Sequence, residues 1–181
     1  MGKAIPYGVF DIKENEGWAS VGIDHDTAEF ASQAIVRWWK KMGCKRYPNA
    51  KKILVMSDGG GSNGSRCKLW KVSLKTLANK LNIPISVCHF PPGTSKWNKI
   101  EHRMFSHITQ NWRGIPLVSI DVIINLIANT TTKMGLKIKA WLDNNKYETG
   151  KKVTDDELSE IKMKANKFHG DWNYTINPVK V

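Results

Sequence analysis

The sequence predicts a mixed α/β domain in which helices flank a mixed sheet, and three observations support this fold class. Short β-prone runs alternate along the chain with longer segments whose apolar residues repeat at helical spacing. The expected order is two strands, a helix, a strand, a helix, a strand and a helix, which is typical of a sheet covered by helices. With 181 residues, 41% of them hydrophobic, the chain can form one domain with a buried core.

The first elements are predicted to be a hairpin and a helix. Residues 7–12 and 18–23 are β-prone and are separated by a polar segment, so they predict two antiparallel strands. Asp26 and Glu29 have the spacing of a capping box. The apolar residues that follow repeat at helical spacing until Gly43, which predicts a helix over this segment.

Two further strands are expected to bring polar residues to one edge of the sheet. The apolar run 53–56 predicts a buried strand, with Asp58 at its carboxyl end. Ser65 can begin the next helix, and residues 85–90 predict another strand. After a loop rich in proline and glycine, a third helix is expected with Glu101 in its first turns. Ligands of such sheets gather at the carboxyl ends of the strands, so this edge is the candidate site.

The last third of the chain predicts four more features. A fourth helix is expected over residues 119–132, followed by an alternating stretch at 136–139. Thr154 and Glu157 have the spacing of a second capping box and predict a helix start. Residues 168–176 read as an aromatic, extended tail.

Charge is distributed unevenly along the chain. The sequence has 28 Lys and Arg against 16 Asp and Glu, a net charge of +12 that favours a polyanionic partner. Between Phe30 and Ile120 the only acids are Asp58 and Glu101, among 16 Lys and Arg. A surface that binds phosphates needs cations everywhere except where a metal ion is held. This distribution predicts a DNA-binding surface around a small carboxylate centre.

Asp58 and Glu101 are the candidate catalytic and metal-binding residues. Two-metal phosphoryl transfer uses carboxylates from separate elements to hold Mg²⁺ or Mn²⁺ ions roughly 4 Å apart. Residue types alone leave an alternative open, in which Asp58 begins a glycine turn and Glu101 is a solvent-facing helical residue. The scarcity of other acids nearby favours the functional interpretation.

Residues around the two carboxylates are candidate DNA contacts. The glycine-rich segment 59–65 could let a DNA backbone approach closely or cradle a phosphate, although an ordinary flexible connection explains it equally well. Basic residues beside Glu101 could contact phosphates or simply form a solvated helix face, and Trp97 could stack on an unpaired base. The full set is Lys96, Trp97, Asn98, Lys99, Arg103, Ser62 and Asn63.

The sequence gives no sign of a zinc site, disulfides or a membrane segment. The three cysteines are 23 and 21 residues apart, without the paired spacing of zinc ligands, which favours reduced thiols. No apolar run approaches the roughly 20 residues that span a bilayer, and a signal peptide pattern is absent at the amino terminus. We therefore expect a soluble cytoplasmic protein with no membrane partner.

Two segments carry a resemblance to a known family. They are Val55–Ser65, which contains Asp58, and Cys88–His102, which contains Glu101. Both closely resemble the ISAzo-type insertion-sequence transposases of bacteria, related to the Tc/mariner-like DDE group, and the likeness covers nearly the whole chain. By this resemblance Asp58 and Glu101 match the second and third family carboxylates, and Asn98 matches an asparagine that recurs three residues before the glutamate.

The resemblance implies an RNase H-like fold and a function in DNA transposition. Such a transposase cleaves the phosphodiester at the ends of the element and joins the freed 3′ hydroxyl to target DNA, using Mg²⁺ or Mn²⁺ in a two-metal site. It also implies a homodimer at full length and a location in the bacterial cytoplasm with the nucleoid. Residues 1–135 are expected to form the catalytic core, and residues 136–181 a C-terminal extension packed on it.

One departure from the family pattern keeps other functions open. The first family carboxylate belongs on a strand that should precede residues 7–12, and this strand and the amino-terminal helix-turn-helix region are not found in the sequence. Asp11 and Asp24 could replace that carboxylate only if the strand order differed from the family's. The alternatives are a catalytically inactive DNA-binding remnant and a related RNase H-like nuclease.

Overall fold

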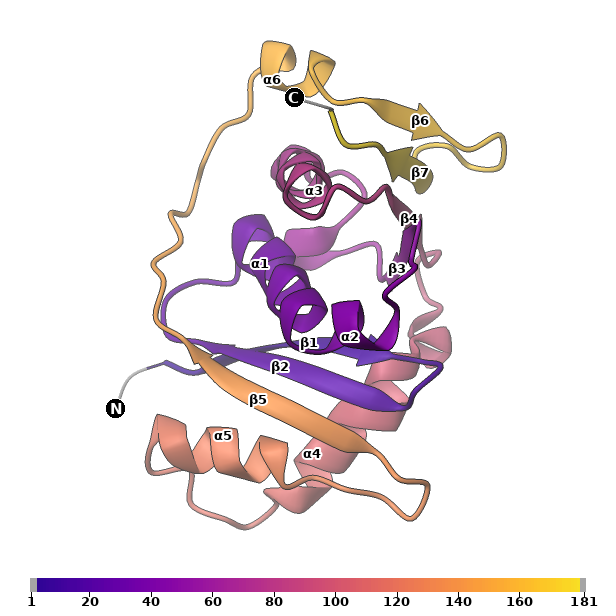
Figure 1. Ribbon diagram of the computed structural model, residues 1–181. Helices are drawn as coiled ribbons and strands as arrows, with labels where there is room; N and C mark the ends of the chain where they lie inside the picture. Colours follow the sequence, from indigo (N-terminus) through magenta and orange to yellow (C-terminus); the bar gives the residue numbers. More distant parts are fainter. Residues whose placement is uncertain (1–2, 180–181) are drawn as a thin grey trace. The chain divides into compact units, whose positions relative to one another are not determined.

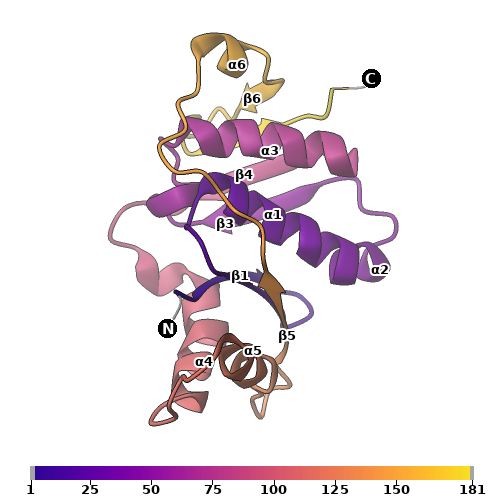
Figure 2. The ribbon, with the colours of Figure 1, turned by 90° about the vertical axis from the view of Figure 1, so that its left-hand side faces the viewer.

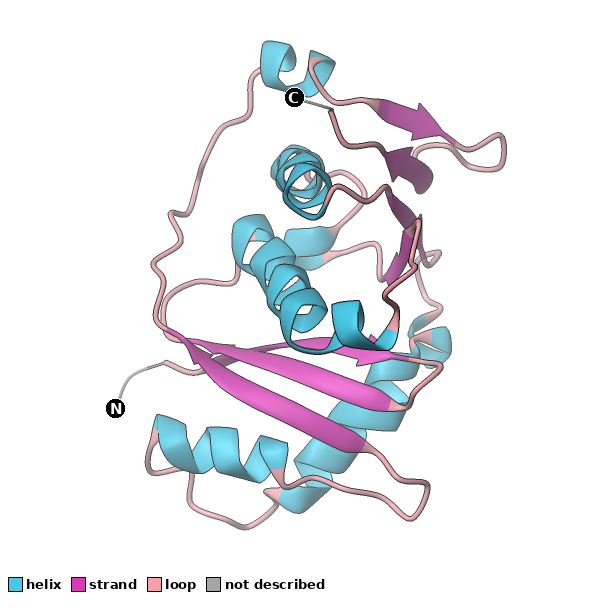
Figure 3. Cartoon of the chain, viewed as in Figure 1, coloured by secondary structure: helices cyan, strands magenta, loops and turns pink. Residues whose placement is uncertain are grey.

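The computed structural model describes residues 3–179, except for the Ser95 side chain, as two compact units. Unit 1 comprises residues 1–26 and 96–147, and unit 2 comprises residues 27–95 and 148–181. Each unit contains a mixed sheet together with helices, which confirms the predicted fold class (Figures 1 and 3). Residues 1–2 of the predicted core and residues 180–181 of the predicted C-terminal extension lie outside the described range.

The sheet of unit 1 has three strands in the order β1-β2-β5. β1 (Ile5–Asp11) and β2 (Glu16–Gly22) pair in an antiparallel hairpin, as the sequence predicts. β5 (Lys137–Asp143) begins within the predicted alternating stretch, extends beyond it, and pairs in parallel with β2. The parallel pairing joins segments more than 100 residues apart, so no local pattern in the sequence could indicate it.

Helices of unit 1 pack on this sheet through one apolar cluster. A 3₁₀ turn, η3 (Ser95–Trp97), precedes a π-helical turn, η4 (Glu101–Phe105), which continues into α4 (Ser106–Asn111). Ser119 caps α5 (Ile120–Ala128) by accepting a hydrogen bond from the backbone N–H of Val122. The buried members of the cluster are Ala19, Val21, Met104, Ile108, Ile127, Leu136 and Ile138.

A glycine lets the helical segment approach the hairpin closely. A Cβ atom on Gly8 of β1 would lie 2.5 Å from Met104 Cε and 2.7 Å from Phe105 Cζ. It would also lie 3.0 Å from Ile100 Cδ1. Real Cβ contacts are longer than the first two distances, so η4 occupies the space that any side chain at this position would need.

The Gly8→Ala substitution should therefore destabilise the protein by about 1–3 kcal/mol through overpacking. The measurement is the free energy of unfolding in a chemical denaturant. Gly60→Ala is the matched control, because a Cβ there meets nothing within 4 Å and its φ of −117° is open to any residue. Equal stability of the two variants would contradict the close packing of η4 on β1.

The sheet of unit 2 has four strands in the order β3-β4-β7-β6. β3 (Ile53–Ser57) and β4 (Ile85–His89) are parallel and lie where the sequence predicts strands. β7 (Asn173–Ile176), from the predicted extended tail, pairs antiparallel with β4. β6 (Met163–Ala165) completes the sheet beside β7 and was not predicted.

The helices of unit 2 lie side by side. α1 (Ala28–Trp38) continues through a π-helical turn, η1 (Trp39–Gly43), into the short α2 (Cys44–Arg46), in agreement with the predicted helix. α3 (Lys68–Leu81) packs against α1 (Figure 2). It also contacts β7. Trp70, Leu74 and Leu77 of α3 are fully buried, which follows from their spacing on one face of the helix.

The predicted start of α1 is wrong by one residue. Thr27, not Asp26, caps the helix, and its Oγ1 accepts a hydrogen bond of 3.2 Å from the backbone N–H of Phe30. Glu29 does not complete a capping box, because its carboxylate pairs with Lys151 at 2.9 Å. Neighbouring Asp and Thr side chains are both good caps, so spacing alone could not choose between them.

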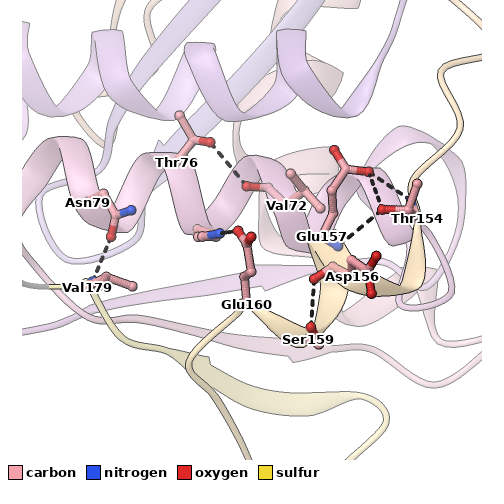
Figure 4. A network of polar contacts seen from close by, with 10 residues as sticks. Val72, Thr76, Asn79, Thr154, Asp156, Glu157, Ser159, Glu160 and Val179 are labelled. Carbon is pink, nitrogen blue, oxygen red and sulfur yellow. Dashed lines mark hydrogen bonds and ion pairs between the residues drawn. The ribbon is translucent and has the colours of Figure 1, made fainter.

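The second predicted capping box is confirmed. Thr154 accepts a hydrogen bond from the backbone N–H of Glu157, whose carboxylate accepts one from the backbone N–H of Thr154, at the start of α6 (Asp155–Ser159) (Figure 4). Beyond this helix, Glu160 pairs with Lys75 of α3 at 2.6 Å. Glu160 is exposed and Lys75 is half-buried, so the ion pair links the segment after α6 to α3 at the surface and contributes little to stability.

The described residues give two further results. Cys44, Cys67 and Cys88 are free, which agrees with the prediction of reduced thiols. None of the helices in residues 3–179 has both the length and the apolar character needed to cross a membrane.

Candidate carboxylate site

Asp58 lies directly after β3, where the chain leaves the sheet of unit 2. β3 and β4 are parallel and Ser57 is opposite His89, so the carboxyl ends of both strands share one edge. The backbone N–H of Phe90 donates to the Ser57 carbonyl at 2.8 Å and extends the pairing beyond the strands. Asp58 is exposed at this edge, at the strand end that the sequence predicts.

The glycine-rich loop after Asp58 folds back on itself. It contains a short 3₁₀ turn, η2 (Gly61–Asn63), in which Gly61 adopts a left-handed φ of 71°. The backbone N–H of Gly64 donates to the Gly61 carbonyl at 3.3 Å. A Cβ atom on Gly64 would lie 2.9 Å from the carbonyl oxygen of Gly59, so the fold of the loop requires glycine there. The loop is thus a folded structure.

Ser62 and Asn63, the predicted DNA contacts of this loop, are half-buried. The predicted helix start at Ser65 is wrong by two residues, because Cys67 is the N-cap and α3 begins at Lys68. The backbone N–H of Cys67 instead donates to the carbonyl of Gly64 at 3.0 Å and makes a turn before the helix. The loop therefore does not lead directly into a helix amino terminus, and a phosphate cradle of that kind is not formed.

His89 is a buried polar residue next to Asp58. Its side chain is 5% exposed, and its Nδ1 lies 3.0 Å from both the Asp58 carbonyl oxygen and Ser57 Oγ. On the other side of the ring, Nε2 lies 3.3 Å from the hydroxyl of Tyr174 in β7. A carbonyl oxygen only accepts hydrogen bonds, so Nδ1 carries a proton and Nε2 of the neutral ring accepts from Tyr174.

Burial keeps this network uncharged. It lowers the pKa of His89 below its ordinary value of 6.5, against the opposing effects of the Asp58 carbonyl and carboxylate. Burial also raises the pKa of the Tyr174 hydroxyl well above its ordinary value. Both groups are therefore neutral near pH 7, and the network joins β3, β4 and β7 by hydrogen bonds alone.

Neither His89 nor Tyr174 was singled out from the sequence. The available signal was weak: a histidine and a serine end two apolar runs of similar length, which become the parallel strands β4 and β3. No local pattern indicates that Tyr174, 85 residues later, lies beside that histidine.

The neutral state of His89 predicts a pH dependence of stability. Below the ordinary pKa of 6.5, the unfolded chain binds a proton that folded His89 resists, so the free energy of unfolding falls as the pH falls. The limiting slope for one such group is about 1.4 kcal/mol per pH unit. Denaturant unfolding of the wild type and of His89→Asn, from pH 7.5 to pH 5, measures this contribution as the difference between the two slopes.

The choice of Asn keeps a donor near the position of Nδ1. His89→Gln, which has the same ability to donate but moves its amide toward the position of Nε2, is the matched control and should be less stable than His89→Asn at pH 7.5. Wild-type and His89→Asn slopes that agree between pH 6.5 and pH 5 would show that His89 is not held neutral.

In unit 1, Glu101 is the first residue of the π-helical turn η4. Helical backbone runs from Lys99 to Asn111, which places Glu101 in the first turns of the predicted helix. Its side chain is exposed, whereas that of Asn98, three residues earlier, is buried. π-helical turns are rare, and the described residues contain two of them, η1 and η4.

The other predicted DNA contacts of unit 1 differ in accessibility. Lys96, Trp97 and Lys99 are exposed, with 51% of Trp97 accessible. Arg103 is half-buried, and its Nη2 donates a hydrogen bond of 3.0 Å to Asn15 Oδ1 in the hairpin turn. Arg103 is therefore engaged within its own unit, while the two lysines and the tryptophan remain accessible.

The two acids considered as substitutes for a first carboxylate have local partners. Asp11 Oδ1 accepts hydrogen bonds from the backbone N–H groups of Lys13 and Glu14, at 3.1 and 3.2 Å, and so shapes the hairpin turn. Asp24 accepts one of 2.6 Å from the backbone N–H of Tyr147, which is the main cause of its lowered pKa. Each carboxylate thus has a structural role.

The carboxylates of Asp58 and Glu101 are of the type that binds a hard cation, but two carboxylates alone are fewer ligands than a metal ion needs. Asp58 belongs to unit 2 and Glu101 to unit 1. Within residues 3–179, no three His, Cys, Asp or Glu side chains gather as a metal-binding group. Oxygen ligands of this type are those that Mg²⁺ prefers, so each carboxylate is of a kind that such an ion can bind.

Comparison with known proteins identifies one family. The sequence profile described as "Rhodopirellula transposase DDE domain" matches residues 1–178. No curated protein and no solved structure matches the chain.

Proposed function

Because the chain belongs to the family of Rhodopirellula transposase DDE domains, we propose that it cleaves and joins DNA as the catalytic domain of an insertion-sequence transposase. Membership confirms the resemblance found in the sequence, and the mixed α/β fold agrees with an RNase H-like domain. The proposed substrates are the ends of the element and target DNA. We further propose a homodimer at full length that acts in the bacterial cytoplasm with the nucleoid.

The position of Asp58 is the observation that most supports this function. It is an exposed carboxylate at the shared carboxyl edge of two parallel strands, and its backbone is fixed by a buried histidine. We assign Asp58 and Glu101 as the residues that hold divalent ions. Mg²⁺ or Mn²⁺ held by such carboxylates would activate the attacking oxygen and stabilise the leaving oxygen of the phosphodiester.

DNA contacts are proposed for residues on both units. Exposed Lys96 and Lys99 would bind phosphates, and exposed Trp97 would stack on a base. Four less exposed residues, two in the glycine-rich loop and two near Glu101, complete the set of proposed DNA contacts. These are Asn98, Arg103, Ser62 and Asn63.

The proposed division of the chain is a core of residues 1–135 with a C-terminal extension of residues 136–181. The extension contributes strands to both sheets, with β5 in unit 1 and β6 and β7 in unit 2. We propose that it is an integral part of the transposase fold.

Nicking of supercoiled plasmid in Mg²⁺ or Mn²⁺ tests the catalytic assignment. The chain should nick DNA only with a divalent ion, and Asp58→Ala and Glu101→Ala should each lower the rate by at least a hundredfold, because each removes a metal ligand. Asp155→Ala is the matched control, because it also removes an exposed carboxylate, one that pairs with Lys68 at 2.9 Å, and it should nick at the wild-type rate. Nicking that survives both carboxylate substitutions would refute the assignment.

A second function is favoured by the incomplete ligand set of the described residues. In this alternative the chain binds DNA without cleaving it. Metal-dependent nicking would exclude it, whereas tight DNA binding by a folded chain that never nicks would support it over the catalytic proposal. A related nuclease would differ from a transposase in cleaving DNA without paired element ends.

The salt dependence of DNA binding tests the proposed phosphate contacts. Replacing Lys96 or Lys99 by Ala should lower the slope of log K against log salt by about one, since each contact displaces about one counterion. Lys151→Ala is the matched control, because it removes the same charge but its ammonium group is held by Glu29. Slopes that change equally in all three variants would mean that net charge, not a defined contact, determines binding.

A further inference from the structure

The turn between β6 and β7 carries a cluster of three aromatic side chains, Phe168, His169 and Trp172. The rings of Phe168 and His169 meet edge to face at 4.3 Å between centroids, and those of His169 and Trp172 stack at 5.6 Å. Phe168 is 71% exposed, so one face of the cluster is open to solvent. An exposed phenylalanine in an ordered contact with its neighbours provides a flat apolar surface for a ligand.

The backbone of this turn is fixed by its own hydrogen bonds. The Asn173 side chain donates to the carbonyl oxygens of Phe168 and His169 at 3.1 and 3.2 Å. The backbone N–H groups of Trp172 and Asn173 both donate to the His169 carbonyl at 2.9 Å. These bonds hold His169 at a left-handed φ of 45°, a conformation that a non-glycine residue rarely adopts. The rings are therefore preorganised, which lowers the entropic cost of binding.

The turn lies at the same edge of the sheet as Asp58. The backbone N–H of His89 donates to the Trp172 carbonyl at 3.0 Å, and β4 and β7 pair with Cys88 opposite Asn173. On its other side, His89 is opposite Ser57, the residue before Asp58. Adjacent strands are about 4.8 Å apart, so the backbone of Trp172 lies roughly 10 Å from the end of β3. Figure 1 shows the yellow hairpin of β6 and β7 beside β4.

The surroundings of the turn suit a nucleic acid better than an apolar partner. Lys162, Lys164 and Lys167 are exposed on the same hairpin, and Asp171 is the one acid between residues 162 and 173. Lysines bind the phosphates of a strand while aromatic rings stack on its bases, a combination typical of surfaces for single-stranded nucleic acid. In duplex DNA the bases are already stacked, so the occupant must be an unpaired base.

We infer that the turn of residues 166–173 is a stacking site for an unpaired base of a DNA strand bound along the edge of the sheet that carries Asp58. Phe168 supplies the open face, His169 meets it edge to face, and Trp172 stacks on His169. The inference rests on the proposed function for the identity of the strand as substrate. The site itself is defined by the geometry of unit 2 and does not require cleavage.

Binding of a single-stranded oligonucleotide that contains 2-aminopurine tests the site, with the full chain and with EDTA in place of divalent ions. Stacking quenches 2-aminopurine fluorescence, so the wild type should quench it strongly. Phe168→Ala should reduce the affinity for the single strand about tenfold, or about 1.4 kcal/mol. Its affinity for a blunt duplex of the same length should stay within twofold of the wild type.

Two matched variants separate stacking from loss of apolar surface or of fold. Phe168→Tyr keeps an aromatic face and should restore quenching and affinity. Met163→Ala removes an apolar side chain that is 44% exposed on the same hairpin but opposite Ile176, away from the turn, and should behave as the wild type. Because Phe168 is so exposed, neither of its substitutions should prevent folding.

The outcomes distinguish this inference from the proposed catalytic function. Quenching that Phe168→Ala abolishes, in a chain that does not nick plasmid, would support the stacking site and count against catalysis. Plasmid nicking together with undiminished quenching by Phe168→Ala would overturn the stacking site alone. Equal losses of affinity for single-stranded and duplex DNA in Phe168→Ala would also overturn the stacking site, since binding to a basic surface without base stacking would explain them.

Discussion

The buried imidazole of His89 is the constraint on which the candidate site depends. A polar group taken out of water must have hydrogen-bond partners, and leaving one unpaired costs about 1–3 kcal/mol. His89 satisfies both ring nitrogens with groups from two different strands, the carbonyl of Asp58 after β3 and the hydroxyl of Tyr174 in β7. The position of the Asp58 backbone is therefore coupled to a strand near the end of the chain.

This coupling explains why the C-terminal segment matters for the site. β7 can supply Tyr174 only if it pairs with β4 in the observed register, with Val87 opposite Tyr174 and Cys88 opposite Asn173. The same register sets the turn of residues 166–173 at the edge where Asp58 leaves the sheet. One pairing thus fixes two features, the backbone of the candidate carboxylate and the aromatic surface beside it. A shift by one residue would turn Tyr174 to the opposite face of the sheet.

Local signals made about half of this arrangement predictable from the sequence. The hairpin at the amino terminus, the strand before Asp58 and the capping box of Thr154 and Glu157 all depend on residues close together in the chain. The pairings of β5 with β2 and of β7 with β4 depend on distant segments, and periodicity carries no information about them. The role of His89 is not predictable from the sequence for the same reason, because its hydrogen-bond partner Tyr174 is 85 residues away. The error at the start of α1 arose because Asp26 and Thr27 are both good caps, whereas α3 begins after Cys67 without a side-chain cap that the sequence could indicate.

The neutral state of His89 also affects the negative charge of the Asp58 carboxylate beside it. A protonated histidine beside Asp58 would compensate its negative charge and compete with any cation that approaches the carboxylate. Burial of the ring prevents this, since it lowers the pKa of His89 and keeps the imidazole neutral near pH 7, and the nearby Lys71 ammonium lowers that pKa further. In a chain with a net charge of +12, Asp58 is the one acid between Phe30 and Ile100, so its negative charge differs from that of the surrounding sequence. The hydrogen bond from His89 therefore fixes the backbone of Asp58 without placing a protonated imidazole beside its carboxylate.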